Sequence, residues 1–269
     1  DGAVGGGSAF GERQPETIRL GDSERQAGSS SHGTGVASID GASGTDARGV
    51  APSAAILSYP VLDESGAGSA FEVAEAIVHA VGSGADVINI SLGSYAESQI
   101  LSEAVSYAQA AGSVVVAAAG NDQFDQLAYP ARYPDVVAVG AVDRLRQQLP
   151  FSHSGVGLDF AAPGIGIVVA QPNDEQALIS GTSASTPFVS GAIAAGLSRF
   201  PEFSPVEGVE WLRQNANEAG APGQDVSFGS GILNLQRAMR DPRARVVDAG
   251  IASHFFTRNS QNQPIVQVV

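Results

Sequence analysis

"DVINISLGSYAESQILSEAVSYAQAAGSVVVAAAGND", residues 86–122, decides the fold of this chain. Two short apolar runs, at 86–92 and 113–119, are rich in β-branched or small residues and are typical of buried strands. Between them, apolar residues recur at helical spacing over 97–112, a segment that ends at a glycine. A strand, a helix and a second strand in this order predict two parallel strands joined by a crossover helix. The apolar helix face consists of Leu101, Ala104, Val105 and Ala108.

The alternation of strands and helices continues on both sides of this stretch. Upstream lie a short apolar run at 54–62 and a helix predicted over 69–84, and downstream a strand follows at 136–142. Two more helices are predicted at 184–199 and 204–219. Nearly continuous apolar strands imply a sheet that is covered on both faces. We therefore expect an α/β fold with three layers, α/β/α, around a mostly parallel central sheet.

The pattern of apolar and polar residues changes after Met239, and this change indicates the domain organisation. We expect one domain over 1–240 and a C-terminal tail over 241–269. Short apolar runs alternate with polar turns in the tail, which predicts β-structure and the start of a further module.

Composition excludes several classes of function. The net charge of −14 argues against nucleic acid as a partner, because phosphate binding needs basic patches. There is no cysteine, so disulfides and thiolate metal sites are excluded. Every basic residue other than histidine is arginine, which excludes Schiff-base and P-loop lysines. No apolar stretch approaches the ~20 residues that a membrane helix needs, so we expect no membrane span.

Three short motifs each allow a structural and a chemical interpretation. The hydroxyls of "SGTSASTP" (180–187) either cap a helix or place a nucleophilic serine at its positive end. His32, at a junction of loop and helix, is either a surface or capping residue or a general base. Gly120 and Asn121 end an apolar strand, and they form either a plain turn or an amide donor aimed at a developing oxyanion.

Nine motifs in order resemble the subtilisin-like serine proteases, the subtilase family, over about 30–240. They are "HGTGVAS" (32–38), "GVAPSAAI" (49–56), "INISLG" (88–93), "AAAGN" (117–121), "YPARYPDVVAVGAVD" (129–143), "LPFSHSG" (149–155), "DFAAPG" (159–164), "GTSASTPFVSG" (181–191) and "GSGILNL" (229–235). The resemblance implies a serine endopeptidase that hydrolyses peptide bonds in proteins or peptides by a Ser-His-Asp acyl-enzyme mechanism.

The resemblance assigns the catalytic roles. Ser183 would be the nucleophile and His32 its general base, while Asn121 and the Ser183 N–H would form the oxyanion hole. Asp1, followed by Gly2 and Ala3, stands where the family has the aspartate that orients the histidine. The apolar strand that normally delivers this aspartate is absent, so we expect the native protein to continue upstream. Asp22 and Asp40 are the other acids near His32, and neither is in a matching motif.

The resemblance also implies a cleft that binds the substrate as an added strand. The two flanking backbone segments would be Gly66, Ala67 and Gly68, and Ser91, Leu92 and Gly93. The primary pocket would be lined by Ala118, Ala119, Gly120 and Ala128, again with Leu92. Small side chains leave room for a large apolar substrate residue. Asp122 would lie at the pocket mouth and tolerate arginine or lysine there.

Cofactors, partners and location are expected from the same resemblance. Catalysis needs no cofactor. Asp40 and Asp46 carry oxygens that calcium prefers, but their segment is interpreted as a solvated loop, and a structural calcium ion is assigned to no residue. An inhibitory propeptide outside this chain is expected as a partner, and the location would be extracellular or in the cell envelope. Two alternatives stay open, a narrow processing protease and a subtilase-fold pseudoprotease that serves as a binding or regulatory scaffold.

Overall fold

A computed structural model describes residues 3–20, 30–44, 48–63 and 65–240, together with the backbone of 257–258 and 264–265. Asp1, Asp22 and Asp46 therefore lie outside the described residues. So does most of the predicted tail, in which only the short antiparallel pair β9 (Thr257–Arg258) and β10 (Pro264–Ile265) is described.

A four-stranded parallel sheet forms the centre of the fold, in the order β3-β4-β5-β6. The sequence prediction of parallel neighbours at 87–92, 114–119 and 136–142 is confirmed. The strands are β3 (Val87–Ile90), β4 (Val114–Ala118), β5 (Val136–Val142) and β6 (Leu158–Pro163). A separate parallel pair joins β1 (Glu16–Thr17) to β2 (Leu57–Ser58), and an antiparallel hairpin joins β7 (Ile167–Ala170) to β8 (Gln176–Ile179).

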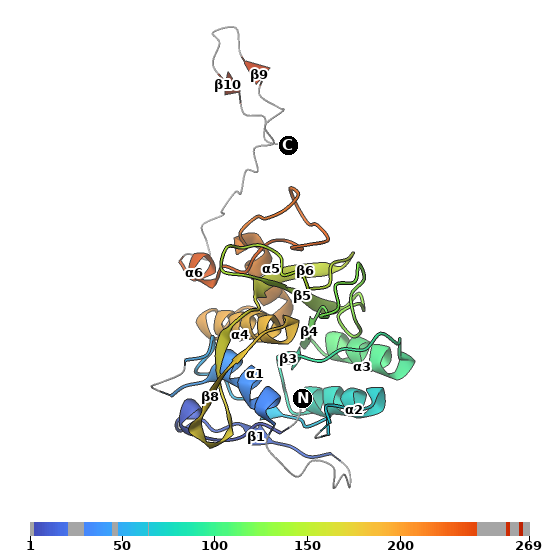
Figure 1. The fold of residues 1–269 in the computed structure, drawn as a ribbon, viewed down its shortest axis with the longest axis vertical. Helices are drawn as coiled ribbons and strands as arrows, with labels where there is room; N and C mark the ends of the chain where they lie inside the picture. The colour runs from blue at the N-terminus through green and yellow to red at the C-terminus, as the bar shows by residue number, and fades with distance from the viewer. Residues whose placement is uncertain are drawn as a thin grey trace.

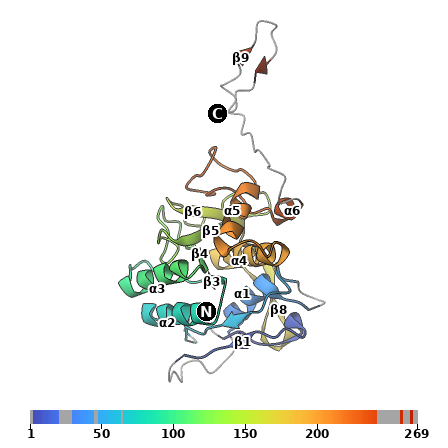
Figure 2. The same ribbon diagram turned by 180° about the vertical axis from the view of Figure 1, so that it is seen from behind.

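Helices cover both faces of the central sheet, as Figures 1 and 2 show from opposite sides. Along β4, Val115 and Ala117 pack against α2 and α3, whereas Val114 and Val116 pack against α4 and α5. This alternation follows from the two-residue period of a strand, and it confirms the three-layer prediction. The helices are α1 (Ser31–Gly41), α2 (Ala70–Gly82), α3 (Gln99–Ala110), α4 (Thr182–Arg199), α5 (Pro205–Asn215) and the short α6 (Leu235–Ala238), with 3-10 turns η1 (Ser8–Phe10) and η3 (Pro172–Asp174).

Local sequence explains where these helices begin. Ser69 and Ser204 each accept a hydrogen bond from the backbone of a glutamate three residues on, and that glutamate bonds back to the serine. Such capping boxes satisfy N–H groups that have no partner within the helix. The last predicted helix is shorter than expected, because it ends at Asn215 rather than at 219.

A cleft of about 720 Å³ separates β2 from β3 and is lined by α1, α2 and α4 as well as both strands. Glu16 N–H donates to the Ile56 carbonyl, so one edge of β2 faces β1 and its other edge faces the cleft. In the same way Val114 N–H donates to Asp86, so β3 bonds β4 on one edge and borders the cleft on the other. The cleft is therefore bordered by one edge of β2 and one edge of β3.

Candidate active site

Ser183 is the second residue of α4 and is half-buried. Its N–H belongs to the first turn, whose N–H groups have no partner within a helix and favour negative charge. Gly181 precedes the helix with φ 143°, a conformation that favours glycine, and a Cβ there would lie 3.3 Å from Asn121 Nδ2. Glycine therefore lets the Asn121 amide approach the start of α4. Ser185 is fully buried and donates to the Ala162 carbonyl at 3.1 Å, which makes it a packing residue.

Asn121 is anchored at the start of α4 by Thr182. Its side-chain oxygen accepts hydrogen bonds from the Thr182 N–H at 2.8 Å and from the Thr182 hydroxyl at 3.0 Å. The Thr182 hydroxyl in turn accepts from the Gly120 N–H at 3.2 Å. Because a backbone N–H can only donate, Oδ1 must face Thr182, and the amide NH₂ is left to donate elsewhere. Sequence reasoning missed Thr182, whose hydroxyl is fully buried between these two partners.

Pro187 lies inside α4. It is the sixth residue of the helix rather than a first-turn residue. Since proline has no N–H, the Ser183 carbonyl four residues earlier lacks its helical donor. The Ser91 hydroxyl donates to that carbonyl at 3.0 Å instead. The end of β3 is thereby joined to the residue expected to be the nucleophile.

His32 is the second residue of α1, where Ser30 caps the first turn by accepting from Gly33 N–H at 3.1 Å. The residue is exposed at the surface, yet partial burial of its ring lowers the pKa of the imidazole below its ordinary value of 6.5. Helix α1 packs against α4, so His32 and Ser183 lie on neighbouring helices. A hydrogen bond between the two side chains stays a prediction.

Residues 3–5 hold the chain next to the start of α1. The Ala3 carbonyl accepts from the N–H of the capping Ser30 at 2.6 Å. Gly5 N–H donates to the Thr34 hydroxyl at 2.8 Å, and Val4 N–H donates to the Ser58 hydroxyl at 3.3 Å. The predicted role of Asp1 itself falls outside the described residues.

Several of the predicted pocket residues are brought together. Ala128 N–H donates to the Ala119 carbonyl at 2.8 Å, and a Cβ on Gly93 would lie 3.1 Å from the Ala128 methyl group. Ser94 and Tyr129 exchange backbone hydrogen bonds beside them. Ala118 and Ala119 are buried, while Leu92 packs against the core formed with α2 and α3.

The backbone segment at 66–68, predicted to flank the substrate, is an exposed turn built around Asp63. Asp63 N–H donates to the Ala67 carbonyl at 2.8 Å, and Ala67 N–H donates to the Asp63 carboxylate at 3.0 Å. Both backbone groups of Ala67 are therefore engaged within the turn. Pairing of a substrate with Gly66 and Gly68 stays a prediction.

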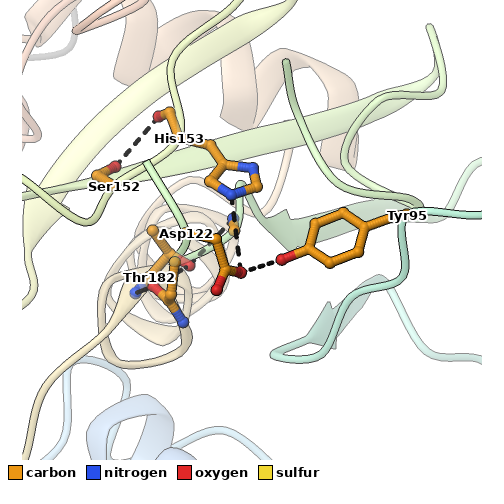
Figure 3. A network of polar contacts seen from close by, with 7 residues as sticks. Tyr95, Asp122, Ser152, His153 and Thr182 are labelled. Carbon is orange, nitrogen blue, oxygen red and sulfur yellow. Dashed lines mark hydrogen bonds and ion pairs between the residues drawn. The ribbon is translucent and has the colours of Figure 1, made fainter. Parts of the chain in front are cut away.

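Asp122 lies beside a buried histidine that sequence reasoning did not single out (Figure 3). Its carboxylate is 58% exposed, accepts a hydrogen bond from the Tyr95 hydroxyl, and lies 3.9 Å from His153 Nε2. His153 is fully buried, and burial lowers the pKa of its ring. A Cβ on Gly120, where φ is 119°, would lie 2.3 Å from His153 Nδ1. The ring thus fills the space beneath the turn that carries Asn121.

The interpretation of 40–49 as a solvated loop is wrong for Asp40, which lies in α1. Helix α1 continues to Gly41, and Asp40 accepts a hydrogen bond from the Ser190 hydroxyl of α4 at 2.5 Å. Burial raises the pKa of Asp40 to about 7. Within the described residues, no three His, Cys, Asp or Glu side chains gather as they would around a metal ion. No helix there is long and apolar enough to cross a membrane.

Comparison with known proteins places these features in a wider group. The model of the subtilase family matches residues 10–231. Subtilisin Savinase from Lederbergia lenta is 37% identical over 239 residues, which cover 88% of this chain and 84% of that protein. An alkaline protease from Shouchella clausii is also 37% identical, but the match spans only 60% of its length. Among solved structures, the prenylagaramide maturation protease PagA has a TM-score of 0.78 at 33% identity, covering 88% of this chain and 90% of PagA.

Proposed function

This chain belongs to the subtilase family of serine endopeptidases, and from that premise we propose that Ser183 is its nucleophile, His32 its general base and Asn121 its oxyanion donor. The observation that carries the proposal is the double anchoring of Asn121 by Thr182, one residue before the serine. A surface asparagine in an ordinary turn needs no such pair of donors. Two donors are needed to fix an amide that must point in one direction toward a reacting atom.

The proposed reaction begins with a neutral imidazole. His32 takes the Ser183 hydroxyl proton as Oγ attacks the carbonyl carbon of the substrate. The imidazolium then gives that proton to the departing amine, which leaves an acyl ester on Ser183. A water molecule, deprotonated by the same imidazole, hydrolyses the ester and restores the serine. A lowered pKa keeps His32 neutral and ready to accept a proton at neutral pH.

Negative charge develops on the substrate oxygen in both tetrahedral intermediates. The Asn121 NH₂ and the Ser183 N–H would donate to that oxygen together, at the positive end of α4. Because Thr182 fixes the amide before the reaction, little reorganisation is needed when the charge appears. This arrangement supports the oxyanion role of Asn121.

We propose that Asp1 completes the triad once an apolar strand precedes it. The hydrogen bonds of residues 3–5 to Ser30, Thr34 and Ser58 bring the chain to the start of α1, two residues after Asp1. An upstream strand in the cleft between β2 and β3 would end at this point. In that arrangement Asp1 would accept a hydrogen bond from His32 Nδ1 and support the imidazolium.

We propose an extended peptide as the substrate, bound beside the strand end at 91–93 and the turn at 66–68 by backbone hydrogen bonds. The small walls around Ala119 and Ala128 favour a large side chain in the primary pocket. A narrow processing activity is the second candidate, because PagA, a maturation protease, is similar over most of both chains. By family likeness we also propose inhibition by a propeptide and a location outside the cell or in its envelope.

The proposal is tested by hydrolysis of chromogenic peptides and of denatured casein. We expect both to be cleaved by the wild-type chain, and neither by the Ser183→Ala or His32→Ala variants. Cleavage of only one peptide sequence would favour the processing protease. Absence of cleavage by a folded wild-type chain, extended upstream of Asp1, would favour the pseudoprotease scaffold.

A further inference from the structure

A chain of side-chain hydrogen bonds connects the helix that carries His32 to the residue proposed as nucleophile. The Ser190 hydroxyl lies 2.5 Å from Asp40 Oδ1 and 3.2 Å from Asn89 Oδ1. Asn89 Nδ2 donates to the Ser91 hydroxyl at 3.0 Å, and Ser91 donates to the Ser183 carbonyl at 3.0 Å. The path therefore runs from α1 through α4 and β3 back to the first turn of α4.

The direction of the bonds from Ser183 to Asn89 can be deduced from the fixed end of this path. The Ser183 carbonyl can only accept, so the single Ser91 proton is committed to it. Ser91 must then accept from the Asn89 NH₂, which turns the Asn89 oxygen toward Ser190. The single Ser190 proton can go to that oxygen, to Asp40 Oδ1 or to the Thr186 carbonyl at 3.4 Å. When Ser190 donates to Asn89, its bond to Asp40 needs a proton on the carboxyl, whereas an ionised Asp40 accepts from Ser190 instead.

Loss of the Asp40 proton reverses the hydrogen bond between Asp40 and Ser190 and interrupts the hydrogen-bond path. A carboxylate can only accept, so the Ser190 proton turns to Asp40. The Asn89 oxygen then loses its donor from Ser190, and the amide that orients Ser91 is less firmly held. The effect would reach the Ser183 carbonyl, which depends on Ser91 because Pro187 has no N–H to offer.

We propose that Asp40 is a positioning residue. This proposal rests on the catalytic roles proposed for Ser183 and His32. In its protonated form it completes a one-directional hydrogen-bond path that fixes the first turn of α4. In its ionised form it releases that path. The close approach of the two helices favours such coupling, since a Cβ on Gly191 would lie 3.1 Å from the Asp40 carbonyl oxygen and 2.8 Å from Val50.

The environment of Asp40 favours titration in the neutral range. Burial raises the pKa of the carboxyl to about 7, opposed by hydrogen bonds from Ser190 and Gly191. The charged or titratable groups on the surrounding elements are His32 on α1, Arg48 after it, Asp86 before β3, Arg199 at the end of α4, and Tyr59 in the cleft wall.

Two variants separate positioning from simple packing. Asp40→Asn keeps the shape and donates to Ser190 at every pH, so it mimics the protonated form. Ser190→Ala removes the link and leaves Asp40 in place. We expect wild-type kcat to fall about two- to tenfold as Asp40 ionises, with KM unchanged. We expect kcat of Asp40→Asn to stay at the higher value across that range, and kcat of Ser190→Ala to be low and unresponsive to Asp40.

A second measurement does not depend on activity. In the inactive Ser183→Ala chain, NMR of the Asn89 side-chain amide should show a shift that follows the ¹³C titration of the Asp40 carboxyl. The shift should vanish in Ser190→Ala and in Asp40→Asn. An Asn89 amide that ignores the Asp40 titration would overturn the inference, even if the enzyme is active. A coupled amide in a chain without peptidase activity would uphold the path and refute the catalytic roles instead.

Discussion

Replacing Thr182 with valine removes one of the two anchors of Asn121 and leaves the other. Valine matches threonine in shape at this fully buried position, but it loses the hydroxyl that donates to Asn121 and accepts from Gly120. A hydrogen bond contributes about 0.5–1.5 kcal/mol net, so two lost bonds should cost about 1–2 kcal/mol of transition-state stabilisation once the remaining N–H bond is counted. At about 1.4 kcal/mol per tenfold, kcat should fall by roughly 5–30-fold with little change in KM.

Removal of the Asn121 side chain sets the upper limit of the fall in kcat. Asn121→Ala should lower kcat by ~10²–10³, a magnitude taken over from a subtilisin. Steady-state kinetics on a chromogenic peptide should give both values, with Thr182→Ser as the control that keeps the hydroxyl. In the Asn121→Ala background, Thr182→Val should lower kcat by less than about twofold, because the group it positions is already gone. An equal loss in both backgrounds would refute the anchoring argument.

Three further predictions concern the general base, the missing strand and the pocket mouth. Protonated His32 cannot accept a proton, so kcat/KM should fall as the pH drops through the lowered pKa of His32, below 6.5. Because this pKa is lowered, activity should extend to more acidic pH. A flat profile from pH 5 to 9 would argue against a histidine base. A chain extended upstream of Asp1 by an apolar strand should be at least tenfold more active than the 269-residue chain, about 1.4 kcal/mol of barrier, whereas equal activity would show that Asp1 is well placed without it. Asp122→Asn should lower kcat/KM about two- to fivefold for substrates with arginine in the primary pocket and leave phenylalanine substrates unchanged, since the carboxylate is exposed and screened; equal losses for both would refute a charge effect.

Local pattern was enough to predict β3, β4 and β5 of the central sheet and the helices α2 to α5, whereas β6 was not predicted. Strands such as β4 are continuous apolar runs, and α3 carries an apolar face at regular spacing, so their identity depends on neighbours in sequence. Asn121 could be singled out for a similar reason, because a polar residue directly after a buried strand lies at the edge of the sheet where sites form.

Features that depend on contacts between distant residues could not be predicted in this way. Asp40 was interpreted as part of a solvated loop, but α1 extends to include it, and Ser190 of α4 supplies its partner. The role of Thr182 is likewise invisible in sequence, since its partners lie 61 and 62 residues away. His153 is buried because it packs beneath Gly120. The hydrophobic periodicity of the sequence could not predict this contact.

The central claim, that Ser183 is an activated nucleophile, is tested most directly by a serine-directed fluorophosphonate probe. The labelled chain would be digested, and the modified residue located by mass spectrometry. We predict one adduct per chain, on Ser183, with labelling that is lost in His32→Ala and slowed in Asn121→Ala. A folded chain, extended upstream of Asp1, that takes up no label, or is labelled on Ser185 or another serine, would contradict the claim.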